Sequence, residues 1–347
     1  MAMVPDDAEQ RGSRVRVAVL AALLTVGAVA LLAFACVRKT DGVLVYALDD
    51  AYIHLAMGRT LAESGVWGLN ANTPGAASSS PLWTLALAGL TLIFGQQTWL
   101  PLALNVLAAG TLALVADLWL RELSLRPTWR VAAVAAIVII GPVGPLAMTG
   151  MEHVAHAAAI VLLAALALRG RPAGPAALGL CAALATGLRY ESAFVAAALA
   201  VVMLLRGDRR RAMGLVTGPA IVVVGVGLVQ ISAGQGFLPN SLVVKAVSFS
   251  LPGLAGWVRW KAFGAVQRAF EAPVVGIPLL AMLLAWAAAV RVRDPRPPMA
   301  VRIALEAGAA VSLSMLLQIT LADTGWYHRY EAYLLMWGIL SVSVSLR

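Results

Sequence analysis

A series of apolar segments, separated by short polar connections, occupies most of this chain. A helix that crosses the hydrocarbon core of a membrane needs about 20 predominantly apolar residues. Measured against that length, the sequence predicts an all-α polytopic membrane protein with about ten transmembrane helices. The predicted spans are residues 17–37, 98–120, 131–148, 153–168, 174–188, 192–205, 212–232, 273–290, 300–321 and 332–346.

Composition excludes the soluble classes of protein. Of the 347 residues, 61% are apolar and 12% are charged, and the mean hydropathy is +0.85. Soluble domains have roughly 45–50% apolar and about 25% charged residues, so a soluble enzyme and a disordered chain are both excluded. The net charge of +9 would indicate nucleic acid in a soluble chain, but here it indicates basic cytoplasmic connections. We therefore expect membrane lipids, and no nucleic acid, as partners.

The first apolar run follows Arg11, Arg14 and Arg16 and has no convincing small-residue cleavage site. We interpret it as a signal anchor that stays in the mature protein. The sequence then divides into a cytoplasmic N-terminus at 1–16 and a single transmembrane domain at 17–347. Within that domain, 38–97 is expected to form the first outer loop and to carry interfacial helices. No C-terminal soluble domain is expected.

Segment 81–95 is ambiguous between a short span and a helix at the membrane surface. Its 15 residues make about 22 Å of helix, which is short for a span. If it does not cross, 17 of the 26 basic residues lie on the same side as the N-terminus; if it crosses, most arginines fall outside. The positive-inside rule favours the first arrangement, with both termini cytoplasmic and 81–95 on, or dipping into, the outer leaflet.

This topology places the polar clusters of the chain on the outer side of the plasma membrane. The clusters are LDDAYIH at 48–54, NANTPGAASSSP at 70–81, TGMEHVAH at 149–156, RYE at 189–191, GFLPNSLVVK at 236–245 and WYHRYE at 326–331. The cytoplasmic connections are short and basic. The extracytoplasmic side is therefore the predicted working face.

Asp49 and Asp50 begin a stretch, AYIHLAMGRTLAESG, that is typical of an amphipathic helix lying along the membrane. Neighbouring positions on a helix point about 100° apart, so the two carboxylates cannot share one role. One can act in a cavity while the other caps the helix or holds a cation. Alternatively, both are simply favourable charges at a helix start. The sequence indicates no cofactor apart from a divalent cation that this pair has the chemistry to bind.

Glu152, Arg189 and Glu191 lie at the outer ends of predicted spans, where ionisable residues are costly and often functional. Together with Lys245 and Arg329, they provide cations that can neutralise charge on a leaving phosphate. They also provide carboxylates that can accept the proton of an attacking hydroxyl group. The structural alternatives are neutralisation of Arg189 by Glu191, a first-turn charge at Glu152, and interfacial anchoring of the cations.

The histidines offer a second interpretation of the same region. Glu152, His153 and His156 have a spacing compatible with a helical metal site, which His54 and His328 could complete. The zinc-protease pattern, however, places its histidines four apart with the glutamate between them. We therefore predict no metal site here.

The order of these motifs resembles the GT-C superfamily of membrane glycosyltransferases, and most closely the mycobacterial terminal arabinofuranosyltransferases and their uncharacterised bacterial relatives. The similarity runs over about 42–335 and is carried by LDDAYIHLAMGRTLAESGVWGLN, SSSPLW, TGMEH, RYE, LPNSLVVK and HRYEAYLL. SSSPLW replaces a commoner threonine-containing version. Many relatives carry a C-terminal carbohydrate-binding domain that is not found before Arg347.

The resemblance implies transfer of a sugar from a polyprenyl-phosphate donor to a cell-envelope glycan or lipid acceptor, with inversion and a carboxylate base in the first outer loop. By position, Asp49 and Asp50 match the catalytic acidic pair. Residues implied in donor or substrate binding are Tyr52, His54, Glu152, Arg189, Glu191, Asn240, Lys245, His328, Arg329 and Tyr330. Between the aspartates we favour Asp49 as the base, because Asp50 is better placed by sequence to cap the following helix.

Two other functions fit a membrane protein of this composition. A transporter or flippase for polyprenyl glycolipids would use the same outward face, but the chain shows no convincing half-to-half repeat. A non-catalytic subunit of an envelope-biosynthesis complex would not need six polar clusters on one face.

Labelling of single cysteines tests the predicted orientation. In a variant without Cys36 and Cys181, a cysteine near Gln96 or Gln97 should react with an impermeant thiol reagent added outside. A cysteine near Ser124 should not, because the positive-inside rule places it in the cytoplasm. Permeabilised cells, in which both positions should react, are the control. Labelling at Ser124 in intact cells would contradict the ten-span topology.

Overall fold

A computed structural model describes residues 7–72, 74–75, 78–237, 299–322 and 329–345 of the chain. These parts consist of helices and their connections, with no β-strand among them, as the sequence predicts. The predicted span at 273–290 lies outside the described residues. The helices are α1 (Asp7–Lys39), α2 (Asp50–Ser64), α3 (Pro81–Phe94), α4 (Leu100–Glu122), α5 (Pro127–Ile140), α6 (Val143–Ala147), α7 (His153–Leu168), α8 (Pro175–Leu188), α9 (Ser192–Leu205), α10 (Arg209–Ser232), α14 (Met299–Leu321) and α15 (Ala332–Ser345).

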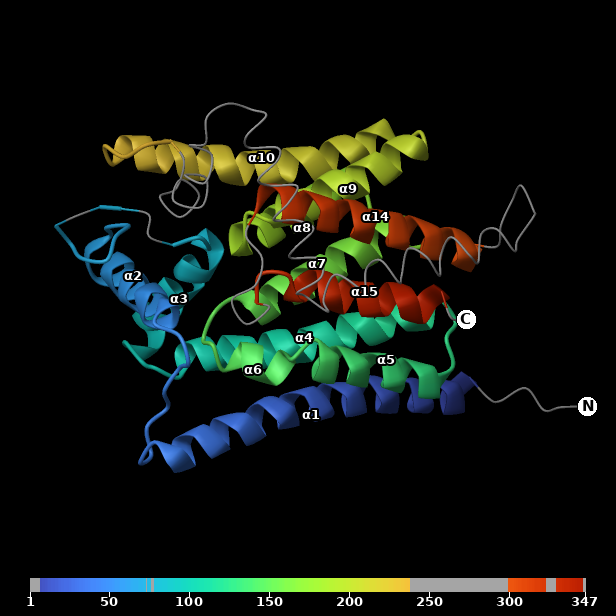
Figure 1. Ribbon diagram of the computed structural model, residues 1–347, viewed down its shortest axis with the longest axis horizontal. Coiled ribbons are helices and arrows are strands. Elements are labelled where there is room, and N and C mark those ends of the chain that lie inside the picture. The colour runs from blue at the N-terminus through green and yellow to red at the C-terminus, as the bar shows by residue number, and fades with distance from the viewer. Residues whose placement is uncertain (1–6, 73, 76–77, 238–298, 323–328, 346–347) are drawn as a thin grey trace, which may run out of the picture.

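Most of these helices run along one common direction and form a bundle (Figure 1). α1 packs against α4 and α5, and α4 packs against α7. α7 packs against α8 and α15, α10 against α8 and α9, and α14 against α9 and α15. Because the chain reverses between successive helices, the connections gather at the two ends of the bundle.

α2 and α3 depart from this arrangement. They pack on each other at one end of the bundle, which we call the α2/α3 end (Figure 1). α3 corresponds to the ambiguous segment 81–95, and its last turn exposes Leu92, Ile93 and Phe94. Membrane lipid can cover such an apolar surface. The start of α1 and the end of α15 lie at the opposite end.

Within the described residues, four helical segments are long and apolar enough to cross a membrane: Ala22–Lys39, Leu100–Glu122, Arg209–Ser232 and Val301–Ile319. The predicted membrane character is thus supported by α1, α4, α10 and α14. The other predicted spans within the described residues form helices of 14–16 residues. At 1.5 Å per residue these are about 21–24 Å long, less than the roughly 30 Å of a hydrocarbon core. The number of ten spans is therefore not confirmed and stays a prediction.

The predicted span at 131–148 is broken within its GPVGP sequence. α5 ends at Ile140 and α6 begins at Val143, with Gly141 and Pro142 between them. Proline has no N–H to continue a helical ladder. The break lets the short α6 lead the chain into the turn at 148–152, which carries part of the site described below.

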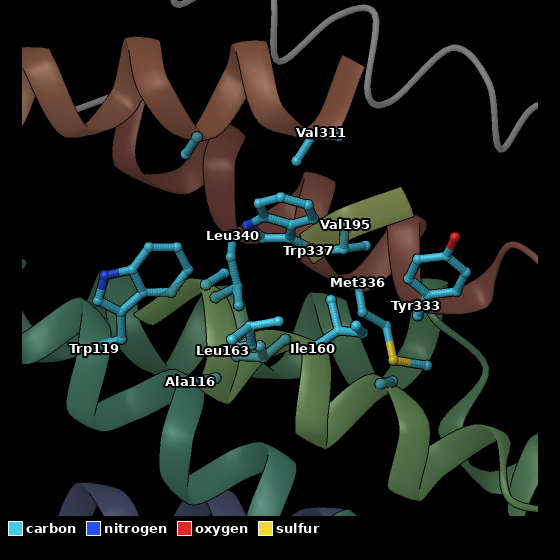
Figure 2. Close-up of a cluster of buried hydrophobic side chains, with 14 of the residues drawn as sticks. Ala116, Trp119, Ile160, Leu163, Val195, Val311, Tyr333, Met336, Trp337 and Leu340 are labelled. Atoms are coloured by element: carbon cyan, nitrogen blue, oxygen red, sulfur yellow. The ribbon is translucent and has the colours of Figure 1, made fainter. Parts of the chain in front are cut away.

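Large buried side chains from several helices form the core of the bundle (Figure 2). Trp119 of α4, Ile160 of α7 and Trp337 of α15 are each almost fully buried in one continuous cluster. Lipid tails are as apolar as these side chains, so van der Waals packing, and not removal from water, holds membrane helices together. The cluster thereby fixes how α4, α7 and α15 sit against one another.

α8 and α10 approach each other closely because small residues face one another along their contact. A Cβ on Gly214 would overlap the backbone of Pro175, and a Cβ on Gly218 would overlap that of Gly179. Small residues four positions apart are what allows helix backbones to come close in membranes. This contact anchors α8, whose last residue directly precedes Arg189.

Candidate functional site

Five segments that are distant in the sequence meet at the α2/α3 end of the bundle. They are the start of α2, the serine-rich stretch before α3, the turn before α7, the connection between α8 and α9, and the start of α15. Each carries one of the polar clusters of the sequence. Within the described residues, the structure therefore supports the prediction that these clusters share one face.

Arg189 is the centre of a buried ion network at this end. Its Nη1 donates to Glu152 Oε1 at 2.8 Å, and its Nη2 donates to Glu191 Oε1 at 2.7 Å. The Arg189 side chain is 1% exposed and that of Glu152 is fully buried. Burial alone would raise the pKa of the Glu152 carboxyl, but the imidazole of His153 and the guanidinium of Arg189 outweigh it and hold that pKa below its usual range. Glu152 is therefore a carboxylate at neutral pH.

His54 connects this network to α2 and α3. Its Nδ1 shares a 3.3 Å hydrogen bond with Ser78 Oγ, which also accepts a 2.9 Å hydrogen bond from Thr84. Its Nε2 lies 3.7 Å from Glu152 Oε2. Burial lowers the pKa of His54 despite the opposing effect of the Glu152 carboxylate. The ring is therefore neutral at neutral pH, and it links the first outer loop to the turn before α7.

Arg329, just before α15, joins the network from the C-terminal side. Its Nη1 lies 2.9 Å from Asp50 Oδ2 and also donates to the Met151 sulfur at 3.0 Å. The centroid of the Tyr330 ring lies 5.2 Å from the Arg189 guanidinium carbon and 5.0 Å from that of Arg329. Cations over a tyrosine face are held by the ring quadrupole, so Tyr330 contributes to holding both arginines in one cluster.

The structure reverses the capping assignment that was favoured from the sequence for the two aspartates. Asp49 is the N-cap of α2, and its Oδ1 accepts a 3.0 Å hydrogen bond from the Asp50 backbone N–H. Asp49 is exposed, whereas Asp50 is half-buried and faces Arg329. The assignment of Asp50 as the cap was therefore wrong. α2 already includes Asp50 as its first residue, so the cap is the residue before it, Asp49.

Gly150 determines how α2 meets the turn before α7. It has φ +69°, and a Cβ at this position would overlap the Tyr46 ring and Ala51. Glycine alone combines this conformation with such a close approach. On the other side of the turn, Asn105 Nδ2 donates to the carbonyls of Ala147 and Met151 at 3.2 and 3.0 Å. These contacts hold Glu152 between α2 and the bundle.

The remaining sequence-predicted residues lie apart from this network or outside the described residues. The Tyr52 hydroxyl accepts a 3.0 Å hydrogen bond from the Tyr46 backbone N–H, and Tyr52 is partly exposed. Asn240, Lys245 and His328 lie outside the described residues, so their predicted roles in substrate binding stay predictions.

Other residues of the cluster were not proposed as site residues from the sequence. Ser78 and Thr84 hold His54, and Ser192 shares a 2.8 Å hydrogen bond with His156 Nε2. Glu331 is buried next to Arg329. Each belongs to or borders a polar cluster in the sequence, but serines and threonines in an apolar chain commonly bond to their own helix backbone, so the sequence offers no sign of these partners.

The described residues contain no group of three or more His, Cys, Asp or Glu side chains arranged to hold a metal ion. In the acidic pair that has the chemistry to bind a divalent cation, Asp50 Oδ2 is paired with Arg329. A cavity of about 540 Å³ lies at the opposite end of the bundle, lined in part by Ser124, Arg126 and Trp129. It does not include any residue of the Arg189 network.

Comparisons with protein-family models, with curated proteins and with solved structures found no match. The resemblance to GT-C glycosyltransferases therefore rests on the motifs quoted above. What the geometry adds is that the described motifs converge on one buried cluster of charges and imidazoles.

Replacing the central arginine tests the network as a structural unit. Arg189→Met should lower the free energy of unfolding by about 3–5 kcal/mol, because Glu152 and Glu191 would remain buried without their cation. Arg59→Met is the matched control: Arg59 lies 3.5 Å from Glu63, but the two side chains are 49% and 63% exposed. Loss of such a surface pair should cost less than about 1 kcal/mol. Denaturant titration in mixed micelles measures both, and equal losses would contradict the network.

Proposed function

We propose that this protein is an integral-membrane glycosyltransferase of the GT-C type. It would transfer a sugar from a polyprenyl-phosphate donor to a hydroxyl group of a cell-envelope glycan or lipid. Its α2/α3 end would face the extracytoplasmic side of the plasma membrane, which the distribution of arginines in the sequence supports. The apolar helices of the bundle would give the protein access to a lipid-linked donor.

The ion pair between Asp50 and Arg329 is the observation that carries this proposal. It joins the first and the last polar clusters of the sequence at 2.9 Å. Transfer from a phosphate-linked donor requires two groups in one place. A carboxylate must accept the proton of the attacking hydroxyl, and a cation must stabilise charge on the departing phosphate. Asp50 and Arg329 are these two groups, and they lie beside the Arg189 network.

The reaction would be a single displacement. The acceptor hydroxyl gives its proton to Asp50 while its oxygen bonds to the anomeric carbon, and the bond from that carbon to the phosphate oxygen breaks. Polyprenyl phosphate leaves with the electron pair, and Arg329, with Lys245 as a proposed second cation, stabilises its charge. Phosphate leaves without a general acid, so one carboxylate suffices where glycosidases use two. One displacement inverts the anomeric centre.

Asp50 suits the role of base better than Asp49 does. Asp49 is exposed and is occupied in capping α2, whereas Asp50 faces the cluster. In the protein without substrate, Asp50 is paired with Arg329. A donor phosphate that binds Arg329 would compete with Asp50 for the guanidinium. Donor binding would therefore free the Asp50 carboxylate to contact the attacking hydroxyl.

A pair of neighbouring substitutions tests the base. Asp50→Asn should reduce turnover by roughly 100- to 10,000-fold, the range typical for loss of a general base. Asp49→Asn makes the same chemical change at the adjacent position and should cost much less, because only a capping contact of α2 is altered. Turnover is measured as polyprenyl phosphate released from radiolabelled polyprenyl-phosphate sugars. Wild-type turnover in both variants would refute a carboxylate base in this loop.

The same assay separates the proposed enzyme from its alternatives. A flippase would move the donor across the membrane and leave it intact, and a non-catalytic subunit would do neither. Release of polyprenyl phosphate that depends on an added acceptor supports the transferase. Movement of intact donor without release would favour the flippase.

A further inference from the structure

His153, the first residue of α7, is buried without a hydrogen-bond partner. It is 1% exposed, and neither Nδ1 nor Nε2 has a partner among the described residues. Its ring contacts Tyr330 edge to face, with 6.4 Å between the centroids. Leaving a buried polar group unpaired is costly, so an imidazole in this state indicates a partner beyond the described side chains.

The two other described histidines of this end do have partners within the protein. His54 Nδ1 shares a hydrogen bond with Ser78, and His156 Nε2 shares one with Ser192. Ser192 gives its own hydroxyl proton to the Ala185 carbonyl, so His156 is the donor in that pair. His153 is thus the exception among histidines in similar surroundings.

The preceding residue leaves a second atom without a partner. Glu152 Oε1 accepts from Arg189, but Oε2 has no hydrogen-bond partner among the described residues. The nearest donor is His54 Nε2 at 3.7 Å, which is too long for a hydrogen bond. Two consecutive residues of one turn therefore leave three buried polar atoms unsatisfied, beside the Tyr330 ring.

The chemistry of these atoms selects an uncharged ligand rich in hydroxyl groups. An ionised carboxylate only accepts hydrogen bonds, and a neutral imidazole offers one donor and one acceptor. An anion next to Glu152 Oε2 would be repelled by that carboxylate, which shares the Arg189 guanidinium with Glu191. A hydroxyl group both donates and accepts, so neighbouring hydroxyls of a sugar can satisfy the carboxylate and the imidazole together.

We infer that Glu152 and His153 bind the hydroxyl groups of the donor sugar, whereas Arg329 binds the donor phosphate. This inference rests on the proposed function and adds to it a division of the donor site. The turn before α7, with its buried carboxylate, recognises the uncharged sugar, and the cation before α15 recognises the anion. His153 is then a substrate-binding residue.

A pair of isosteric histidine substitutions tests the inference. His153→Leu should leave the thermal unfolding midpoint of the ligand-free protein unchanged or higher, because an unpaired polar group is removed. His156→Leu is the matched control and should lower the midpoint, because it removes the hydrogen bond that His156 donates to Ser192. A midpoint that falls as far in His153→Leu as in His156→Leu would show a purely structural histidine and overturn the inference.

Binding of two kinds of probe completes the test. A panel of methyl glycosides of common pentoses and hexoses, which carry no phosphate, should include one that stabilises the wild type saturably. The same glycoside should bind His153→Leu about 10-fold more weakly, the equivalent of one lost hydrogen bond. Sugar-free polyprenyl phosphate should bind both proteins equally.

These probes keep the inference distinct from the proposed function. If no glycoside of the panel distinguishes the wild type from His153→Leu, the unpaired atoms bind only water and the inference is wrong. If glycosides distinguish them but polyprenyl phosphate binds neither protein, the sugar site stands and the proposed transferase fails.

Discussion

The burial of one positive charge determines the arrangement of this end of the bundle. A guanidinium that is 1% exposed is tolerated among apolar helices only when it is paired and hydrogen-bonded. Arg189 follows the last residue of α8 and takes one partner, Glu152, from the turn before α7 and the other, Glu191, from its own connection to α9. The two connections therefore cannot separate without leaving a buried charge unpaired. Gly150 and His54 then position α2 and α3 against the Arg189 network.

A buried network of this kind is a costly way to obtain stability. Hydrophobic side chains of similar volume are often as stabilising as a buried ion pair or more so, and the apolar core around Trp119 and Trp337 shows that this chain packs such side chains well. Retaining Glu152, Arg189 and Glu191 in the same bundle is therefore better explained by the position and charge that they provide. That argument favours a binding or catalytic end of the molecule over a purely structural one.

Much of the fold could be predicted from the sequence, because apolar runs dictate helices and the bias of arginines sorts the connections. The helix over AYIHLAMGRTLAES and the break at GPVGP both follow from local rules. The choice between Asp49 and Asp50 could not be predicted. Adjacent helical positions differ by about 100°, and the rotation of α2 is set by contacts with distant residues such as Gly150. The lack of a hydrogen-bond partner for His153 among the described residues could not be predicted either, because it depends on which side chains surround the ring in the folded protein.

The two arginines of the cluster differ in a way that bears on the proposed chemistry. Arg189 is held by two carboxylates, one of them fully buried, so an incoming phosphate would have to break the interaction on which the fold depends. Arg329 pairs with Asp50, whose side chain is 36% exposed, and water can solvate that carboxylate when the pair opens. Opening the Asp50–Arg329 pair therefore leaves its carboxylate accessible to water, which is not so for Glu152 when it separates from Arg189. A site that keeps one cation fixed and one exchangeable can bind an anion without unfolding, and it frees a carboxylate as the anion binds.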